Sequence, residues 1–260
     1  NMAKMKACKE GFTIIKQAVG FHNMGMMELP NMFYGEVQSG RRAANRGLMT
    51  EHGLNHVLDC VIAMKEVLGD EVGLALDCGP GWTLPDATRF ARALEPYHIM
   101  WIEDILTGDY TPYVQADLYR DLTMSTSTPV HTGEQIYLRQ NFTELIEKQA
   151  VNIVGPDPAD IGGIAELKWV AEYADLHGIL MAPHGTFDGL IGLAALVQVS
   201  AAMPQNLIAF EYPIGDPAWW YDIVDGLPDD IVKNGQIEVW DRPGLGVDII
   251  PEAAKPYLPE

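Results

Sequence analysis

Six residues with ionisable side chains follow short apolar stretches of the sequence at similar intervals. The stretch Ile99–Ile102, for example, runs directly into Glu103 and Asp104. The six residues are Asp77, Glu103, Glu134, Asp157, His184 and Glu211, with successive spacings of 26, 31, 23, 27 and 27 residues by subtraction. Each interval fits one strand–helix unit of roughly 30 residues. Because the C-terminal strand ends of a (β/α)₈ barrel converge on one face, the pattern predicts five carboxylates and one imidazole at a common centre.

Five carboxylates at one centre would strongly disfavour each other's ionised forms. A divalent cation resolves this conflict, and hard oxygen ligands suit Mg²⁺. We therefore expect Glu103 to bind a metal ion and Asp104 to point the other way, toward a neighbouring loop or cation. Taken singly, a carboxylate at a strand end is more often a helix cap or a surface charge, and a lone His184 is more often structural. The ordered series favours the functional interpretation.

The elements that must position these residues form an alternating pattern. The apolar stretches are continuous, as is typical of parallel strands covered on both faces, and helical patterns separate them. The predicted strands are EVGLALDCG, HIMWIED, TPVHTGE, AVNIVGPD, GILMAPH and NLIAFEYP. The predicted helices begin near Pro85 and at Thr111–Pro112, run through Phe142–Ile146 and Ile164–Ala174, and include an Ala/Leu-rich helix before the last strand. The fold class is therefore α/β, with the architecture of a (β/α)₈-type, modified TIM barrel.

Two segments depart from the repeating pattern. Residues Phe21–Leu48 are rich in Gly, Asn and Met, so we expect a long loop or lid there, followed by a helix. Apolar positions on one face of that helix are Leu54, Val57, Leu58, Val61 and Ile62. The end of the chain is rich in Pro and Gly. We expect residues 1–235 to form the catalytic barrel, starting near its second strand, and residues 236–260 to form a tail that packs over it.

Composition restricts the classes of partner. The 260 residues include 17 Lys and Arg and 36 Asp and Glu, a formal charge of −19, so nucleic acid and anionic membranes are unfavourable partners. No apolar run approaches the roughly 20 residues of a membrane span. Three cysteines without CxxC spacing argue against a disulfide framework. They favour a reducing, cytoplasmic location.

Several quoted motifs resemble the enolase superfamily, specifically its mandelate racemase/muconate lactonizing enzyme branch. They are LALD, MWIED, HTGEQ, VGPDPADIGGIAELKWVAEYA, MAPHG, LIAFEYP and the late PGLGV. The resemblance runs from about Gly11 to the C-terminus. It implies a Mg²⁺ enzyme with a Lys or His base.

The resemblance also implies roles for individual residues. The metal ligands would be Asp77, Glu103 and Glu134. The base His184 would be oriented by Asp157. Glu211 would bind the substrate carboxylate or the enolate oxygen, and Lys16, at the end of GFTIIK, would face His184 across the substrate. His22, in the loop, is a further candidate for substrate binding, as are Asn23, Arg41 and Arg42.

The sequence departs from the family pattern at several positions. Where the family often has Lys-x-Lys, this chain has Lys16-Gln17-Ala18, which weakens a two-base racemase of the Lys type. The frequent D-x-N motif is Asp77-Cys78-Gly79, and Ile105 replaces a frequent Pro. The family's N-terminal capping domain and first barrel strand have no counterpart, so we expect the chain to be a fragment or the ordered part of a longer protein.

The resulting functional hypothesis is a Mg²⁺-dependent dehydratase of a sugar acid, an aldonate or aldarate. The base would abstract the proton α to the carboxylate and so form an enolate that the metal ion stabilises. Loss of the β-hydroxyl from this enolate would give a 2-keto-3-deoxy acid. Two alternatives stay open, a racemase or epimerase of a 2-hydroxy acid and a non-catalytic, truncated family member. We expect a small-molecule carboxylate as substrate, no nucleic-acid or membrane partner, and a homo-oligomer.

Overall fold

The protein is described by a computed structural model over residues 2–36, 46–106, 114–185, 189–215, 217–228 and 230–258. Within these residues the central element is a six-stranded sheet with the strand order β1-β4-β5-β6-β7-β8. Its strands are β1 (Ile14–Ala18), β4 (Gly73–Asp77), β5 (Trp101–Glu103), β6 (Val130–Thr132), β7 (Ile153–Val154) and β8 (Leu180–Met181). Every neighbouring pair is parallel. The predicted parallel α/β architecture is thereby confirmed.

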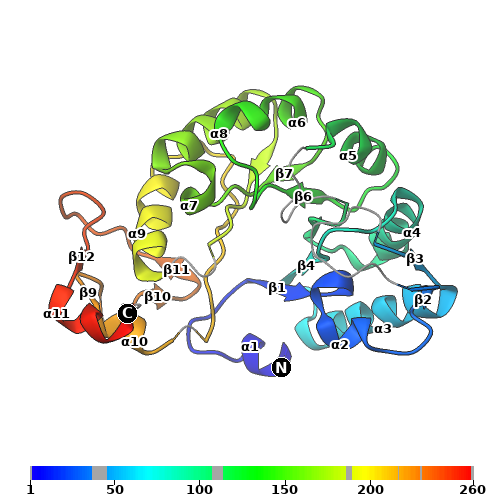
Figure 1. Ribbon diagram of the computed structural model, residues 1–260, viewed down its shortest axis with the longest axis horizontal. Coiled ribbons are helices and arrows are strands. Elements are labelled where there is room, and N and C mark those ends of the chain that lie inside the picture. Colours follow the sequence, from blue (N-terminus) through cyan, green and yellow to red (C-terminus); the bar gives the residue numbers. More distant parts are fainter. Residues whose placement is uncertain are drawn as a thin grey trace.

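Helices form an arc along the outer side of this sheet, as Figure 1 shows. They are α3 (Glu51–Leu68), α4 (Leu84–Leu94), α5 (Ala116–Thr123), α6 (Thr143–Glu147), α8 (Ile164–Leu176) and α9 (Gly189–Ser200). Local sequence fixes where two of them begin. The hydroxyl of Thr50 accepts a hydrogen bond from the backbone N–H of Gly53, and Thr83 caps α4 in the same way through Asp86. Such caps satisfy backbone donors that have no partner within the helix.

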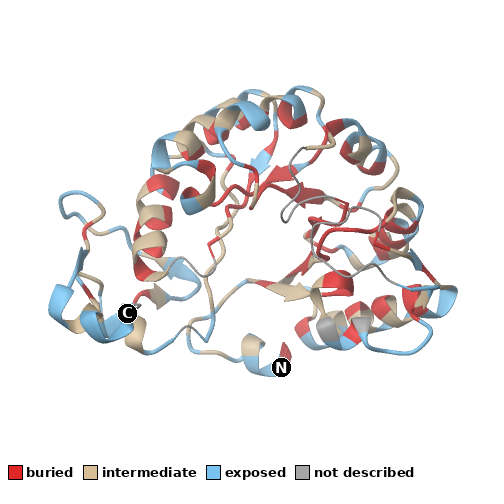
Figure 2. Cartoon of the chain, viewed as in Figure 1, coloured by how far each residue is buried: buried red, intermediate tan, exposed pale blue. Residues whose placement is uncertain are grey.

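The hydrophobic core lies between the sheet and this arc of helices (Figure 2). In α4 the predicted face of Ala87, Phe90, Ala91 and Leu94 is fully buried. In α8 the predicted face is buried from Leu167 onward, but Ile164 is 45 % exposed because it lies at the first turn, beyond the core. A second, inner cluster contains Ala75, Trp101, Ile153 and Ala182, contributed by the other face of the sheet.

Two predictions about secondary structure need correction. The segment predicted as a loop contains η1 (Gly20–His22), α2 (Met24–Met27) and β2 (Phe33–Tyr34), and β2 pairs with β3 (Leu48–Met49). The predicted strand NLIAFEYP forms only an isolated parallel bridge between Leu207 and Met181. The reason is local, because Pro183 has no N–H and cannot continue a regular ladder beside this segment. The predicted helix start at Thr111–Pro112 and the candidates Arg41 and Arg42 lie outside the described residues.

The C-terminal part of the chain forms small antiparallel pairs. β9 (Val224–Asp225) pairs with β12 (Asp248–Ile249), and β10 (Val232–Lys233) pairs with β11 (Gln236–Ile237). Short helices accompany them, namely α10 (Trp219–Asp222), α11 (Pro251–Ala254) and η4 (Lys255–Tyr257). The other short helices are α1 (Met2–Lys6), η2 (Glu95–Tyr97), η3 (Arg139–Asn141) and α7 (Pro158–Ile161). The division into residues 1–235 and 236–260 stays a prediction. Among the described residues, no helix combines the length and the apolarity needed to cross a membrane.

Candidate metal centre and proton-transfer site

Three buried carboxylates converge beyond the C-terminal ends of β5 and β6. Glu103, Asp104 and Glu134 each offer an oxygen atom, and these atoms lie within 4.8 Å of one another. Asp104 follows the end of β5 with a φ of 49°, and its Oδ1 atom accepts a hydrogen bond from the hydroxyl of Thr132 on β6. The hydroxyl of Tyr119 on α5 donates to the same Thr132 hydroxyl at 3.3 Å. Asp104 thus contacts a neighbouring element on the helix side of the sheet, while one of its oxygens lies within 4.8 Å of an oxygen of Glu103 and of Glu134.

Asp77 ends β4 and is in register with Glu103 on β5. Its Oδ1 atom is held by two donors. The Nδ1 atom of His22 lies 2.7 Å away, and the backbone N–H of Gly79 donates at 3.2 Å. The structure therefore places the candidate substrate residue His22 against the carboxylate of Asp77.

Glu103 is fixed at both oxygens. Its Oε1 contacts Lys16 Nζ at 2.6 Å, and its Oε2 accepts a hydrogen bond from the indole of Trp101 at 2.8 Å. Burial raises the pKa of Glu103, but the positive charge of Lys16 and the imidazole of His131 outweigh burial and lower it. Glu103 is therefore ionised and already oriented.

The imidazole of His184 lies beside the cluster and is held by Asp157. The distance from His184 Nδ1 to Asp157 Oδ2 is 2.7 Å. Because an ionised Asp157 can only accept, Nδ1 carries a proton and Nε2 faces the site. Nε2 lies 3.5 Å from Glu134 Oε2 and 3.4 Å from Glu211 Oε2. Burial lowers the pKa of His184, but the hydrogen bond to Asp157 and the charge of Glu211 raise it to above its ordinary value.

Asp157 also begins a helix. Its second oxygen, Oδ1, accepts a hydrogen bond from the N–H of Ala159 at 2.7 Å and caps α7. The side chain is only 2 % exposed. The capping role and the orientation of His184 are therefore properties of one carboxylate, with one oxygen serving each.

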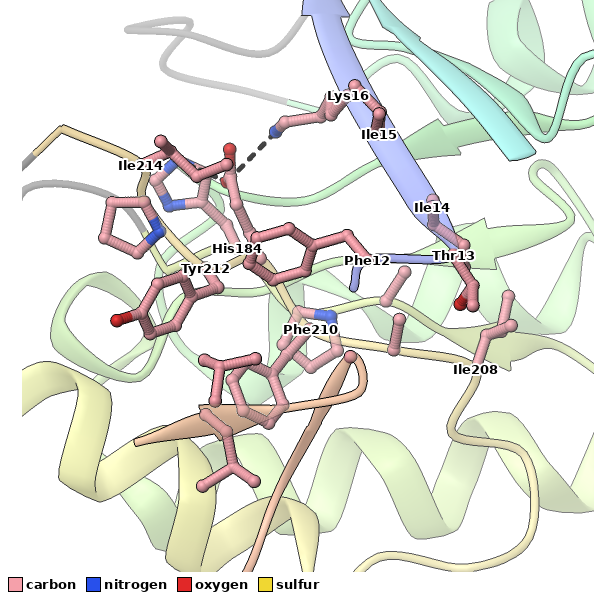
Figure 3. A pocket seen from close by; sticks show the side chains of 18 of the residues that line it. Phe12, Thr13, Ile14, Ile15, Lys16, His184, Ile208, Phe210, Tyr212 and Ile214 are labelled. Atoms are coloured by element: carbon pink, nitrogen blue, oxygen red, sulfur yellow. Dashed lines mark ion pairs between the residues drawn. The ribbon is translucent and has the colours of Figure 1, made fainter. Parts of the chain in front are cut away.

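Lys16 projects from β1 toward Glu211. Its Nζ atom lies 3.0 Å from Glu211 Oε2, the same oxygen that His184 approaches. Burial alone would lower the pKa of Lys16, but four carboxylates raise it well above the usual value; they are Glu103, Glu211, Asp77 and Glu134. Figure 3 shows Lys16 extending from β1 toward His184. Lys16, Glu103, Glu134, His184, Asp157 and Glu211 are thus joined by direct contacts, and His22 contacts Asp77, which lies in register beside Glu103.

Lys16, Glu103, His184 and Glu211 line a cavity of about 960 Å³. One wall is β1 and the residues before it, and the other is the segment from Leu207 to Gly215. Aromatic side chains including Phe12, Phe210 and Tyr212 also line this cavity (Figure 3). A polar end with proton-transfer groups and an apolar wall are typical of small-molecule sites.

Two supporting residues were not predicted from the sequence. His131 is 1 % exposed and stacks on Trp101, with ring centroids 5.3 Å apart and planes at 24°. Its Nε2 lies 3.0 Å from the carbonyl oxygen of Ala182. Nothing in the pattern of HTGEQ distinguishes His131 from an ordinary strand residue. Trp101 could have been predicted from the sequence, because it lies two residues before Glu103 and therefore on the same face of the strand.

Most of the chain matches one known family. Residues 2–253 match the family described as Enolase C-terminal domain-like. The chain belongs to this family. It also belongs to the mandelate racemase/muconate lactonizing enzyme branch, as the resemblance predicted.

Two relatives are named as sugar-acid dehydratases. The chain is 33 % identical over 260 residues to a D-xylonate dehydratase of Haloferax volcanii, covering 99 % of this chain and 59 % of the relative. It is 31 % identical over 194 residues to a D-galactonate dehydratase of Variovorax paradoxus, covering 73 % and 49 %. The crystal structure of a mandelate racemase/muconate lactonizing enzyme-like protein from Rubrobacter xylanophilus superposes with a TM-score of 0.80. It is 32 % identical and covers 98 % of this chain and 59 % of that one. The chain thus spans about half to three fifths of the length of these relatives.

Proposed function

We propose that this protein is a Mg²⁺-dependent dehydratase of a sugar acid, an aldonate or aldarate. The single observation that carries the proposal is the pair His184–Asp157, joined at 2.7 Å beside a buried carboxylate cluster. The dehydratase names of two relatives support the reaction class. The substrate would be a small carboxylate, bound in the cavity between β1 and the segment from Leu207.

Mg²⁺ fits the donor set. Glu103, Asp104 and Glu134 supply hard carboxylate oxygens, the ligands that Mg²⁺ prefers, and they approach one another closely. We propose that Glu103, Glu134 and Asp77 hold the ion, with Asp104 in reach as a further donor. When bound, Mg²⁺ supplies positive charge that stabilises the negative charge developing on the substrate carboxylate as the α-proton leaves.

The protein's own groups then move the proton. Nδ1 of His184 is committed to Asp157, so Nε2 is the atom that accepts the α-proton. The proton held at Nε2 is next donated to the departing β-hydroxyl, and His184 returns to its starting state. The released enol tautomerises to a 2-keto-3-deoxy acid. Glu211 lies beside Nε2 and would hydrogen-bond the substrate carboxylate when that group or the enol carries a proton.

A racemase or epimerase is the second candidate, and one observation favours it. Lys16 and His184 approach the same oxygen of Glu211 from different elements, at 3.0 and 3.4 Å, as a base on each face would require. Against it, the second Lys of the Lys-x-Lys pattern is Ala18 in this chain, and Lys16 Nζ is engaged by Glu103 at 2.6 Å. We therefore assign Lys16 an electrostatic role in dehydration.

The test is to incubate the protein with Mg²⁺ and a panel of acid sugars that includes D-xylonate and D-galactonate. Semicarbazide traps 2-keto-3-deoxy acids and gives an ultraviolet signal. We expect this signal with at least one acid. We expect His184→Asn to reduce turnover by about 10²–10⁴-fold, the usual contribution of a positioned acid–base group. His52→Asn, an exposed substitution on α3, is the matched control and should leave turnover unchanged.

Two results would contradict the proposal. A 2-epimer without keto product from any β-hydroxylated acid would replace dehydration by epimerisation. Full turnover of His184→Asn would remove His184 from the reaction, whatever the product.

A further inference from the structure

We propose that His22 is a positioning residue for the metal site, one that holds Asp77 so that its Oδ2 atom faces the ion. The inference rests on the proposed function only in taking Asp77 as a metal ligand. It assigns His22 a different partner from the sugar acid, for which the loop position alone made it a candidate.

The contact geometry gives His22 the donor role. Its Nδ1 lies 2.7 Å from Asp77 Oδ1, and both side chains are largely buried, at 18 % and 16 % exposure. Asp77 is an acceptor, so the proton is on Nδ1 in either charge state of the ring. The backbone N–H of Gly79 donates to the same oxygen at 3.2 Å. With Oδ1 bound from two directions, Oδ2 is the atom that remains for a cation.

The absence of a side chain at Gly79 explains why His22, from the segment after β1, can donate to Asp77. Gly79 has a φ of 63° and lies at the third position of the Asp77-Cys78-Gly79 motif, where the family often has Asn. A Cβ atom at Gly79 would lie 2.7 Å from Cδ2 of His22 and 2.8 Å from its backbone nitrogen. The backbone and the ring of His22 therefore occupy the space into which a side chain at position 79 would project.

The backbone fixes this approach of the two loops. The N–H of Val19 donates to the carbonyl of Asp77 at 2.8 Å, and the N–H of Phe21 donates to the carbonyl of Cys78 at 3.1 Å. These bonds hold the segment after β1 against the end of β4, and they place His22 beside Asp77. The backbone that carries the His22 ring is therefore fixed by hydrogen bonds, and a residue that positions another side chain needs such support.

Residues that orient metal ligands typically contribute about 10–100-fold in metal affinity. We therefore expect His22→Ala to weaken Mg²⁺ binding to the full chain by about this factor, measured by calorimetry with Mg²⁺ alone and no substrate. His22→Asn should restore most of the affinity, because the amide nitrogen of Asn is at the same distance along the side chain as Nδ1 and also donates. His52→Ala, an exposed histidine of α3, is the control and should bind as the wild type does.

The outcomes separate this inference from the metal proposal. Asp77→Asn and Glu134→Gln should each weaken binding if the proposed ligand set is right. If those variants lose affinity while His22→Ala keeps it or binds more tightly, the positioning role is wrong and the metal site stands. If His22→Ala and His22→Asn lose affinity equally, the role of His22 as a neutral hydrogen-bond donor is wrong. If wild type binds no Mg²⁺ at all, the proposed function itself fails.

Discussion

Asp157 forms two hydrogen bonds that different substitutions separate. Oδ2 accepts from His184, and Oδ1 accepts from the N–H of Ala159 at the start of α7. In Asp157→Asn the carbonyl oxygen can keep the bond to Ala159, and the amide nitrogen then faces His184. Since that nitrogen can only donate, Nδ1 of His184 must accept and its proton moves to Nε2. The atom that should take the substrate proton is then already protonated.

The two variants should therefore differ in stability but not in activity. Both Asp157→Asn and Asp157→Ala should reduce turnover by about 10²–10⁴-fold, since both remove the orientation and basicity of His184. Asp157→Ala also removes the helix cap, which typically contributes about 1 kcal/mol. We expect its free energy of unfolding to be lower than that of Asp157→Asn by about that amount.

The measurements are the initial rate of keto-acid formation and urea unfolding of each variant. Turnover of Asp157→Asn within about tenfold of wild type would refute the role of Asp157 in fixing the imidazole, because the expected loss is larger. Equal free energies of unfolding for the two variants would refute the capping argument. The two tests are independent, because one oxygen serves each interaction.

Two further predictions test the surrounding structure. A methyl group at Gly155 would overlap both Nε2 of His131 and the carbonyl oxygen of Ala182, so Gly155→Ala should lower the free energy of unfolding by about 1–3 kcal/mol in urea. Hydrogen bonds from the side chain and backbone of Arg139 lower the pKa of Glu166. A lowered folded-state pKa gives stability that is present above the unfolded pKa and is lost as pH falls through the folded one. The melting temperature of Glu166→Gln should therefore lie below that of wild type near pH 7 and approach it in acid; a constant difference would contradict this.

The arrangement of the sheet could be predicted from the sequence because apolar stretches and their spacing report burial directly. The same argument placed Glu103 and Asp157 on one edge. Alternation does not extend to Asp104, which follows the end of β5 with a φ of 49° and accepts a hydrogen bond from Thr132. The last predicted strand was wrong, because Pro183 in the adjacent segment interrupts the ladder.

The partner of His22 could not be predicted for a different reason. Its contact with Asp77 joins residues 55 positions apart, by subtraction. His22 ends η1, which has only three residues, and so short an element shows no hydrophobic period from which a face could be predicted. The only local signal was the small residue Gly79, whose missing side chain leaves the space that His22 fills.

The stretch that ends in Glu103 shows how one strand can serve both packing and chemistry. Ile102 points outward and is fully buried in the core against the helices. Trp101 and Glu103 alternate with it and face the inner side, which brings the indole N–H to within 2.8 Å of the Glu103 carboxylate. Burial of Ile102 on one side of the strand thus fixes the position of the charged Glu103 side chain on the other side. The two adjacent carboxylates at the end of the strand therefore differ in their surroundings, because Glu103 lines the cavity and Asp104 accepts a hydrogen bond from Thr132.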